Sequence, residues 1–273
     1  MEEKGVLYIV ATPIGNLEDI TLRAIRILKE VDLIAAEDTR HTLKLLNHLE
    51  ISKQLISYHR HNEEIRSDLL IKELMEGKNI ALVSDAGTPG ISDPGEEIIK
   101  KCIENNISII PVPGACAMIN ALICSGISTN EFIFLGFLPL NKKIRKEKIE
   151  EIKKSTKTII LYEAPHKIKN TLIDLKDILE NRKVVLAREI TKIHEEFIRG
   201  TIEELIIKAE NLKGEIVLII EGKEKENNNE LSELTLEEHY EFYEKEGMDK
   251  KEIIKRIAKD RKVNKNEIYK YFI

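Results

Sequence analysis

The stretch VSDAGTPGISDPG, residues 83–95, joins a short apolar run to a helical pattern, and it decides the class of fold. It packs three glycines, two prolines and the acids Asp85 and Asp93 into one short connection. Open α/β sheets bind their ligands at such connections, beyond the carboxyl ends of the strands. The loop has no lysine, no Gly-Lys-Ser/Thr ending and no G-x-G-x-x-G pattern, and its two carboxylates would repel a pyrophosphate. It therefore predicts an α/β fold whose ligand is not a polyphosphate.

Short β-branched runs alternate with amphipathic helical patterns on both sides of this loop. The first series predicts strands at 6–10, 32–36, 54–58, 79–84 and 107–112, and helices at 21–30, 40–49, 63–77, 96–106 and 115–123. This alternation is typical of a parallel sheet, which we assign to an N-terminal α/β domain over residues 1–120. A second series begins near Phe132 and has fewer helices per strand. It predicts a smaller α/β domain with a mixed sheet over residues 121–222.

The chain then changes character. Residues 223–234 begin KEKENNNELSE, a polar, Asn-rich composition that predicts a linker. Residues 235–273 carry three short helical patterns, with Asp249 and Asn264 placed as helix N-caps. They resemble a helix-turn-helix unit with a basic face. The expected core of this unit is Ile253, Ile254, Ile257, Ala258, Val263, Ile268 and Tyr269.

Composition and charge limit the classes of function that are open to this protein. The 273 residues are 42% hydrophobic with a net charge of −5, which indicates a globular protein and argues against wholesale coating of nucleic acid. The charge is uneven, because residues 141–157 hold eight Lys/Arg against three Glu, and residues 245–270 hold ten basic residues against five acidic ones. Two basic patches on an acidic body suggest an anionic polymer as partner. No membrane-length apolar run and no signal peptide is present, so we expect a cytoplasmic protein.

Cysteine and histidine usage does not indicate a metal centre. Cys102, Cys116 and Cys124 form no C-x-x-C pair, so we expect buried small hydrophobes rather than a disulfide or a zinc site. His59 and His61 are expected on one face of an extended segment, but no neighbouring carboxylate or cysteine completes a ligand set. Hydrogen bonding to a substrate is the favoured role of this pair.

Polar residues follow the predicted strands of both domains. AAEDTRHT ends one strand, and Arg40 among its carboxylates suits a phosphate or hydroxyl. PVPGACAMINAL places Gly114 at a strand-to-helix junction, where backbone N–H groups can meet a ligand. LYEAPHKI, LAREITKIHEE and GEIVLIIEG do the same in the second domain. These edges predict a binding cleft between the domains.

Nine motifs, taken together and in order, resemble those of the ribosomal RNA small-subunit methyltransferase I family. They are VATPIGNLEDIT, AEDTRHTLKLL, SYHRHNE, VSDAGTPGISDPG, PVPGACA, GFLP, YEAPHKI, REITKIHEE and GEIVLIIEG, spread over residues 5–222. The resemblance implies the tetrapyrrole-methylase fold of class III S-adenosylmethionine (SAM) methyltransferases. It also implies a homodimer that methylates the ribose 2'-hydroxyl of a cytidine in the decoding centre of 16S rRNA, within the small ribosomal subunit.

The resemblance carries over a set of cofactor-binding residues. These are Pro13, Ile14, Asp85, Gly87, Thr88, Gly114, Cys116, Ala117, Tyr162, Ala187 and Val217. Many members of the fold have serine where this chain has Cys116, and a thiol is the weaker hydrogen-bond donor, so a backbone contact is expected there. The RNA-binding set is Arg40, His59, His61, Lys142, Lys143, Arg145, Lys250, Lys255, Arg256, Arg261 and Lys262.

A ribose hydroxyl is a weak acid, so a neighbouring base or cation should ease removal of its proton. The candidates are Lys192 and Glu189 in REITK, Asp38 and Arg40 in EDTR, and His61 or Glu63 in HRHNE. We expect Lys192 to act on the hydroxyl, with Asp38 as an orienting partner. Two other functions remain open at this point. One is methylation of a tetrapyrrole precursor, and the other is a nucleic-acid-binding regulator whose α/β body senses a ligand.

Overall fold

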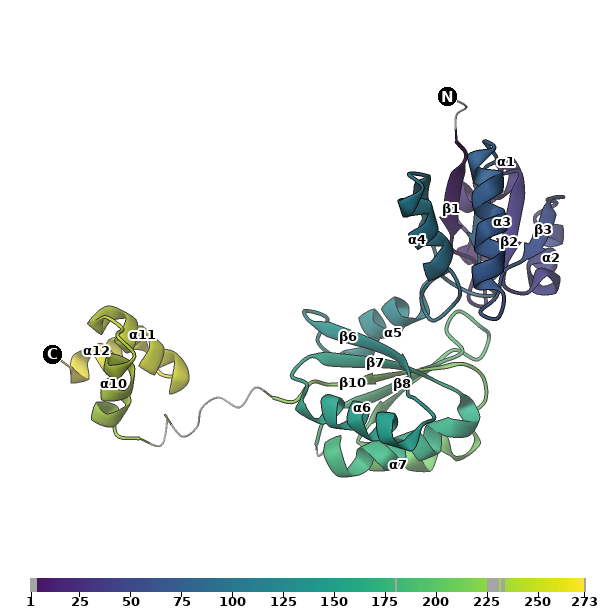
Figure 1. The fold of residues 1–273 in the computed structure, drawn as a ribbon. Coiled ribbons are helices and arrows are strands. Elements are labelled where there is room, and N and C mark those ends of the chain that lie inside the picture. Colours follow the sequence, from purple (N-terminus) through teal and green to yellow (C-terminus); the bar gives the residue numbers. More distant parts are fainter. Residues whose placement is uncertain (1–3, 180, 225–230, 232–233, 273) are drawn as a thin grey trace. The chain divides into compact units, whose positions relative to one another are not determined.

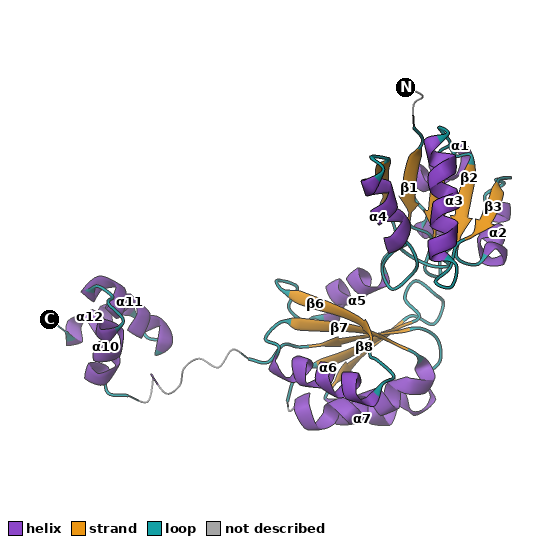
Figure 2. Ribbon diagram, viewed as in Figure 1, coloured by secondary structure: helices purple, strands orange, loops and turns teal. Residues whose placement is uncertain are grey.

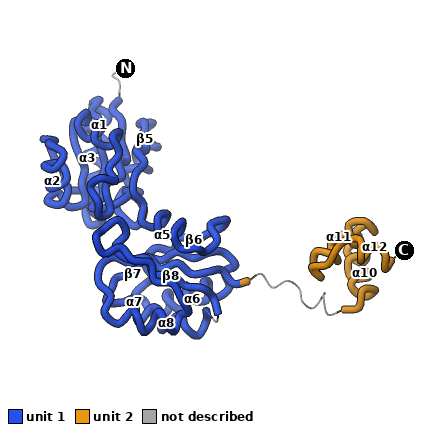
Figure 3. The backbone as a smooth tube through the Cα atoms, turned by 180° about the vertical axis from the view of Figure 1, so that it is seen from behind, with its two compact units in different colours: residues 1–223 blue, residues 224–273 orange. Residues whose placement is uncertain are grey.

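The computed structural model describes residues 4–179, 181–224, 231 and 234–272. Residues 1–223 form one compact unit and residues 224–273 a second (Figure 3). Most of the predicted linker, residues 225–230 and 232–233, lies outside the described residues. No helix in the described ranges is long and apolar enough to cross a membrane.

The first unit begins with a parallel sheet that is flanked by helices (Figure 1). The sheet has five strands in the order β3-β2-β4-β1-β5. Its strands are β1 (Val6–Val10), β2 (Leu33–Ala36), β3 (Gln54–Ser57), β4 (Ile80–Val83) and β5 (Ser108–Val112). The helices between them are α1 (Leu22–Glu30), α2 (Thr39–His48), α3 (Glu63–Met75) and α4 (Glu96–Glu104), with a 3-10 turn at Leu17–Asp19. The expected parallel α/β pattern is confirmed.

This sheet is buried on both faces. Alternate strand residues separate into two cores, because successive side chains of a strand point to opposite faces. Val10, Ile34 and Val83 pack with the helices α1 and α2. Leu7 and Leu82 pack on the other face with α3 and α4. Because the strands are parallel, the loops after β1, β2, β4 and β5 emerge at one edge.

The second sheet is mixed, as predicted, and has the order β6-β7-β10-β8-β9. Figure 2 shows α6 and α7 along one of its faces. Its strands are β6 (Phe132–Phe137), β7 (Thr158–Glu163), β8 (Val184–Arg188), β9 (Glu196–Gly200) and β10 (Ile216–Ile220). The pair β6–β7 is parallel, and the other pairs are antiparallel. Three helices pack on one face, namely α6 (Lys142–Lys154), α7 (Pro165–Leu179) and α8 (Ile202–Lys208), which continues into a 3-10 turn at Ala209–Asn211.

Helix α5 (Ala117–Ser125) covers the other face of this second sheet. It therefore spans the expected domain boundary at residue 120 and packs beside the second sheet. Cys124 near its end is exposed, so the expectation that all three cysteines are buried is wrong for this one. Of the three, only Cys102 is fully buried, and burial raises the pKa of its thiol to about 11.

The second unit contains α10 (Leu236–Lys245), α11 (Lys250–Asp260) and α12 (Lys265–Tyr271). Asp249 and Asn264 cap α11 and α12, as expected from the sequence. Ile253, Ile254, Ile257, Ala258 and Ile268 form the core, joined by Leu231 and Tyr243, which were not expected there. The expectation is wrong for Val263 and Tyr269, which are 40% and 48% exposed.

Candidate active site

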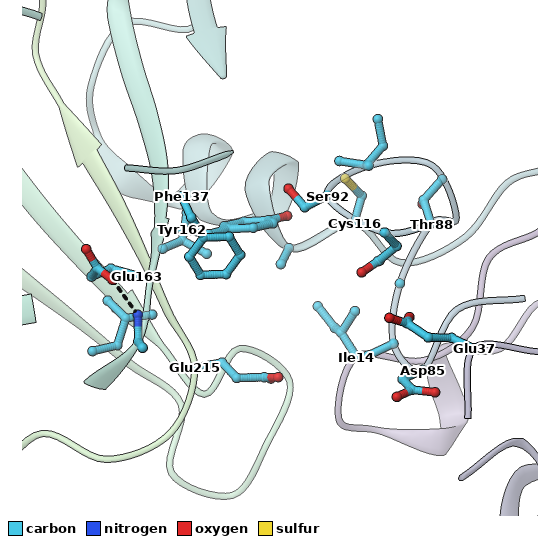
Figure 4. Close-up of a pocket in the computed structure, with 18 of the residues that line it drawn as sticks. Ile14, Glu37, Asp85, Thr88, Ser92, Cys116, Phe137, Tyr162, Glu163 and Glu215 are labelled. Atoms are coloured by element: carbon cyan, nitrogen blue, oxygen red, sulfur yellow. Dashed lines mark hydrogen bonds between the residues drawn. The ribbon is translucent and has the colours of Figure 1, made fainter. Parts of the chain in front are cut away.

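A cavity of about 430 Å³ opens where the loops of the first sheet meet the strands of the second (Figure 4). Loops that follow β1, β2, β4 and β5 form one wall, and the ends of β6, β7 and β10 form the other. The lining residues are Ile14, Glu37, Asp85, Ala86, Gly87, Thr88, Ile91, Ser92, Asp93, Cys116, Ala117, Phe137, Tyr162, Glu163, Ala164, Pro165, Glu215, Ile216 and Val217. The long loop after β4, which contains VSDAGTPGISDPG, supplies the largest share.

The cavity gathers most of the expected cofactor-binding residues. Those that line it are Ile14, Asp85, Gly87, Thr88, Cys116, Ala117, Tyr162 and Val217. Pro13 lines a smaller neighbouring cavity of about 210 Å³, which also includes Asp85. Gly114 and Ala187 are not among the residues that line either cavity. Ala187 is fully buried and pairs with Val217 in the sheet, so it lies behind the wall.

Two loops of the first sheet are fastened together at the cavity. Thr12 N–H donates to the carbonyl of Gly87 over 2.8 Å, and Gly87 N–H donates back to Thr12 over 3.0 Å. Gly87 has φ of +84°, and a Cβ there would lie 3.2 Å from Cγ2 of Ile14. The Thr88 hydroxyl donates to the carbonyl of Ala115 over 3.1 Å. A side chain at position 87 would therefore strain the backbone and crowd the cavity wall.

Five carboxylates among the described residues line this cavity, and Glu37, Asp85 and Asp93 form the group on the side of the first sheet. Burial, reinforced by the nearby Asp85 carboxylate, raises the pKa of Glu37 above its usual value. Burial, together with the charges of Glu37 and Asp85, raises the pKa of Asp93 to about 6. Asp85 is held in place, because the backbone N–H of Asp38 donates to its Oδ1 over 2.9 Å. Such an acid cluster attracts a cationic group and repels phosphate.

From its place in the sequence, three residues before α4, the Asp93 side chain is expected to fix the turn by accepting from the N–H of Gly95 or Glu96. The structure corrects the Gly95 contact, because Gly95 N–H donates to Glu63 over 2.9 Å. Asp93 instead lines the cavity. The loop thus contributes a second carboxylate to the site.

Aromatic rings form the opposite wall. Tyr162 packs edge-on against Phe134 and Phe137, with ring centroids 4.9 and 5.8 Å apart. Burial raises the pKa of the Tyr162 hydroxyl to about 12, so the ring is neutral in water at ordinary pH. The cavity therefore combines an acidic side with an aromatic side. This arrangement fits a ligand that joins a positive charge to a flat ring system.

Lys192, the expected catalytic residue, lies beside this cavity. Its Nζ donates to Glu189 and to Glu215, each over 2.9 Å, and Glu215 lines the cavity. Burial alone would lower the pKa of Lys192, but the two carboxylates outweigh it and raise the pKa above its usual value. Burial alone would raise the pKa of Glu189, but the hydrogen bond from Lys192 outweighs it and holds this pKa below its usual value. Both groups are therefore charged at neutral pH.

The carboxylate of Asp38, the third expected catalytic residue, is hydrogen-bonded to the neighbouring Arg40. Its carboxylate accepts from Arg40 Nε and Nη2 over 3.0 and 2.7 Å, and from the Arg40 backbone over 2.8 Å. These bonds hold the pKa of Asp38 well below its usual range. Arg40 is oriented by this contact, while 88% of its side chain remains exposed.

The expected RNA-binding residues of the first unit differ in availability. The histidine pair lies in a turn rather than in an extended segment, because β3 ends at Ser57 and Asn62 N–H donates to the carbonyl of His59. The His59 and His61 rings still touch, with centroids 6.0 Å apart. In α6, Lys142 and Lys143 are exposed.

Arg145 has internal partners. Its guanidinium donates to Asp174 over 2.8 Å and to the Thr171 hydroxyl over 2.9 Å, and its side chain is 19% exposed. It therefore ties α6 to α7, and the exposed Lys142 and Lys143 are more accessible than Arg145.

The expected RNA-binding residues of the second unit also divide into those with internal partners and those that are accessible. Arg261 donates to His239 and to the carbonyls of Leu234 and Thr235, so it ties α11 to the start of α10. Lys250 donates to the carbonyl of Phe272 over 3.0 Å. Arg256 lies 6.0 Å from the centre of the Tyr243 ring. Lys255 and Lys262 are exposed, and none of the contacts described in this unit occupies them.

Several cavity residues were not among those expected. Glu37 and Asp93 follow strands in motifs quoted above, so their position in the sequence could have predicted that they line the cavity. Phe137 ends the strand in GFLP, and Glu163 and Glu215 flank strands of the second sheet. Phe137, Glu163 and Glu215 share one sequence signal, a strand end in the second domain. Such strand ends predicted a cleft but not these individual residues.

Comparison with known proteins agrees with this fold. The family model described as Tetrapyrrole (Corrin/Porphyrin) Methylases matches residues 6–206. A Ribosomal RNA small subunit methyltransferase I from Halalkalibacterium halodurans is 52% identical, over 99% of this chain and 96% of that relative. The protein of the same name from Bacillus subtilis is 50% identical, over 98% of this chain and 94% of that relative.

A solved structure agrees on the fold. The uroporphyrin-III-C-methyltransferase from Thermus thermophilus has a TM-score of 0.58 and 20% identity, over 80% of this chain and 94% of that chain. The expected fold class, a tetrapyrrole-methylase fold with one parallel and one mixed sheet, is confirmed. The chain belongs to the ribosomal RNA small subunit methyltransferase I family, within the tetrapyrrole (corrin/porphyrin) methylases.

Proposed function

We propose that this protein is a SAM-dependent methyltransferase that 2'-O-methylates the ribose of a cytidine in the decoding centre of 16S rRNA. The observation that carries the proposal is the identity of about half of all residues, over nearly full length, with relatives named Ribosomal RNA small subunit methyltransferase I. The acid-bearing cavity supports it independently, because its chemistry fits the cationic cofactor.

The charge and the aromatic lining of the cavity suit SAM. It carries a sulfonium cation, an adenosine and a carboxylate. Asp85, Glu37 and Asp93 offer negative charge for the cation, and Tyr162 offers an aromatic face for a flat base. The close packing of Gly87 against Ile14 brings backbone groups near the ligand. When bound, SAM supplies a methyl group already activated by its positive sulfur.

The chain's own contribution is alignment and charge. The two walls would hold the reactants in line, which can supply much of the rate enhancement. Asp38 orients Arg40, whose exposed guanidinium suits a phosphate of the target strand. Asp38 itself is a poor proton acceptor, because Arg40 lowers its pKa. We assign the action on the ribose hydroxyl to Lys192.

We assign RNA binding to the accessible basic residues. Lys142 and Lys143 in the first unit, and Lys255 and Lys262 in the second, would neutralise phosphates of the small ribosomal subunit. His59 and His61 would contact the target nucleotide. We further propose that the enzyme works as a homodimer in the cytoplasm, where its substrate is found.

The test is a map of methyl groups on small-subunit rRNA from cells with and without this gene. We expect one cytidine of the decoding centre to lose its ribose methyl group when the gene is absent. The fold also hosts uroporphyrin-type methyltransferases, so a tetrapyrrole precursor is the second substrate for an assay with purified enzyme. An unchanged rRNA map together with methylation of the tetrapyrrole would replace the proposal.

A further inference from the structure

We propose that Glu215 is a positioning residue that holds Lys192 as a fixed cation at the cavity, where the ammonium stabilises the negative charge that develops on the target hydroxyl. This inference rests on the proposed function and deepens it. It assigns a role to Glu215, which is not among the site residues that the family resemblance implies. It also decides between the two actions, base or cation, that the sequence left open for Lys192.

The hydrogen bonds define the arrangement. Lys192 Nζ has three protons, and two of them are directed at Glu189 Oε1 and Glu215 Oε2, each over 2.9 Å. Glu189 Oε1 also accepts the backbone N–H of Glu215 over 3.0 Å, so the two residues are linked to each other. One proton of the ammonium is left for another acceptor. Because Glu215 lines the cavity, the ammonium lies at its edge.

Two glycines make room for this arrangement. A Cβ at Gly15 would lie 2.4 Å from Cγ of Lys192, so the stem of the lysine packs directly on the backbone of the loop after β1. A Cβ at Gly214 would lie 2.2 Å from the Glu189 carboxylate. Both contacts require the absence of a side chain. Lys192 is thus placed against the loop that contributes Ile14 to the cavity.

The loop that carries Lys192 is strained. Glu189 and Thr191 have φ of +51° and +69°, and a β-branched residue rarely adopts this conformation. The Thr191 hydroxyl is buried without a hydrogen-bond partner in the described structure. Strain of this kind persists where the surroundings dictate a geometry, and it clusters at functional sites.

The charges around Lys192 favour the protonated amine. Glu189 and Glu215 face it directly, Glu195 accepts the backbone N–H of Thr191 over 2.6 Å, and Arg188 is turned toward Glu196 over 2.7 Å. A general base must be neutral before it accepts a proton, and two carboxylates oppose that state. A fixed cation requires the opposite, and this is the state that the geometry supports.

The step balances with Lys192 charged throughout. The ribose oxygen forms a bond to the methyl carbon, the carbon–sulfur bond breaks with its electron pair staying on sulfur, and the hydroxyl proton leaves to water. Lys192 stabilises the partial negative charge on the oxygen as the proton departs. Glu215 acts through Lys192 and does not touch the reacting atoms.

The first experiment measures the protonation of Lys192 without any reaction. In protein labelled with ¹³C at lysine Cε, the Lys192 signal is identified by its loss in Lys192→Arg and followed with pH by NMR. We expect Glu215→Gln to lower the midpoint by about one pH unit. Glu203→Gln, a surface substitution in α8, should leave it unchanged. A midpoint that does not move in Glu215→Gln would overturn the positioning role.

The second experiment measures single-turnover methylation of small-subunit rRNA at saturating SAM. Glu215→Gln should lower the rate about tenfold near pH 9 and move the alkaline loss of activity to lower pH. A separate calorimetric titration should give an affinity for SAM within about twofold of the wild type. Glu215→Asp should recover part of the rate, and Lys192→Arg should retain more activity than Lys192→Met. A faster Glu215→Gln enzyme at neutral pH would identify Lys192 as a base and overturn the inference. If the wild-type enzyme methylates no rRNA, the proposed function fails, whereas the NMR titration still reports on Glu215.

Discussion

The backbone N–H of Asp38 donates to the carboxylate of Asp85 over 2.9 Å, which fastens the end of β2 to the loop after β4. The bond joins two stretches of chain that lie 47 residues apart. It fixes one oxygen of Asp85, a residue that lines the cavity. The charge and the position of Asp85 can therefore be tested apart.

Asp85→Asn keeps an oxygen that can accept from Asp38 but removes the negative charge. We expect the affinity for SAM to fall about tenfold, because a cation loses one of its facing carboxylates. S-adenosylhomocysteine has no sulfonium and should bind with nearly unchanged affinity. Calorimetric titration with both ligands measures the difference. An equal loss for the two ligands would mean that Asp85 acts through position alone.

Asp93 should make the binding of a cation depend on pH. Its pKa is raised to about 6 by burial and by Glu37 and Asp85, so the carboxyl becomes neutral as the pH falls through about 6. The affinity for SAM should decline over that interval in the wild type and show a weaker decline in Asp93→Asn. Titrations from about pH 5 to 8 test this, with S-adenosylhomocysteine as the control ligand.

The same raised pKa has a consequence for stability. The unfolded carboxyl titrates near 3.8, so between about 4 and 6 the folded protein holds a proton that the unfolded chain has lost. The stabilising contribution of Asp93 is therefore complete at low pH and is lost as the pH rises through about 6. Asp93→Asn should raise the Tm by about 2 °C near pH 8 and have little effect near pH 3.5, below the pKa of the unfolded carboxyl. Thermal melts at the two pH values decide the sign.

Gly214→Ala should damage the Lys192 arrangement. The new Cβ would lie 2.2 Å from the Glu189 carboxylate, and φ at this position is +87°. We expect a loss of about 1–3 kcal/mol in the free energy of unfolding and a large loss of methylation. Gly126→Ala is the matched control, because φ is +80° there but no atom lies within 4 Å of the new Cβ. Equal losses of activity in both variants would assign the effect to backbone strain.

The second unit should weaken in acid because of His239. This histidine is fully buried, and burial together with the Arg261 guanidinium holds its pKa below the usual value, against the effect of Asp260. The unfolded chain then binds a proton below about pH 6.5 that the folded unit does not, so stability falls as the pH drops. The His239 ring signals, assigned with His239→Gln, should titrate below those of an exposed histidine. A midpoint at or above about 6.5 would contradict this.

The accessible lysines of α11 and of the turn that follows it should set the salt dependence of RNA binding. Lys255→Ala with Lys262→Ala should weaken binding to small-subunit rRNA and reduce the slope of log K against log salt by about one for each phosphate that is no longer neutralised. SAM affinity should not change. Lys29→Ala, at the exposed end of α1, removes a comparable charge and serves as the control. An unchanged slope would place the RNA-binding surface elsewhere.

Local patterns predicted the architecture well, because strands and helices carry their own periodicity. Runs such as those of β4 and β10 are apolar throughout and buried throughout, and Asp249 caps α11 as its position in the sequence indicates. The periodicity does not say how much of a short helix is covered. Val263 and Tyr269 were therefore placed in a core too small to reach them.

The site was predicted only in part, because its polar contacts join residues far apart in the sequence. The motifs shared with the family singled out Asp85, Tyr162 and Val217, and all three line the cavity. The partner of Gly95 turned out to be Glu63 of α3, and the partners of Lys192 turned out to include Glu215. Neither pairing leaves a local signal, because each depends on how two elements meet after folding.

The paired hydrogen bonds between Thr12 and Gly87 have a thermodynamic consequence. They order two cavity loops when the protein folds, before any ligand arrives. Little of a ligand's binding free energy is then lost to freezing those loops, so the wall is preorganised. A substitution that loosens either loop would weaken binding through a larger entropy penalty, even where every residue that contacts the ligand is unchanged.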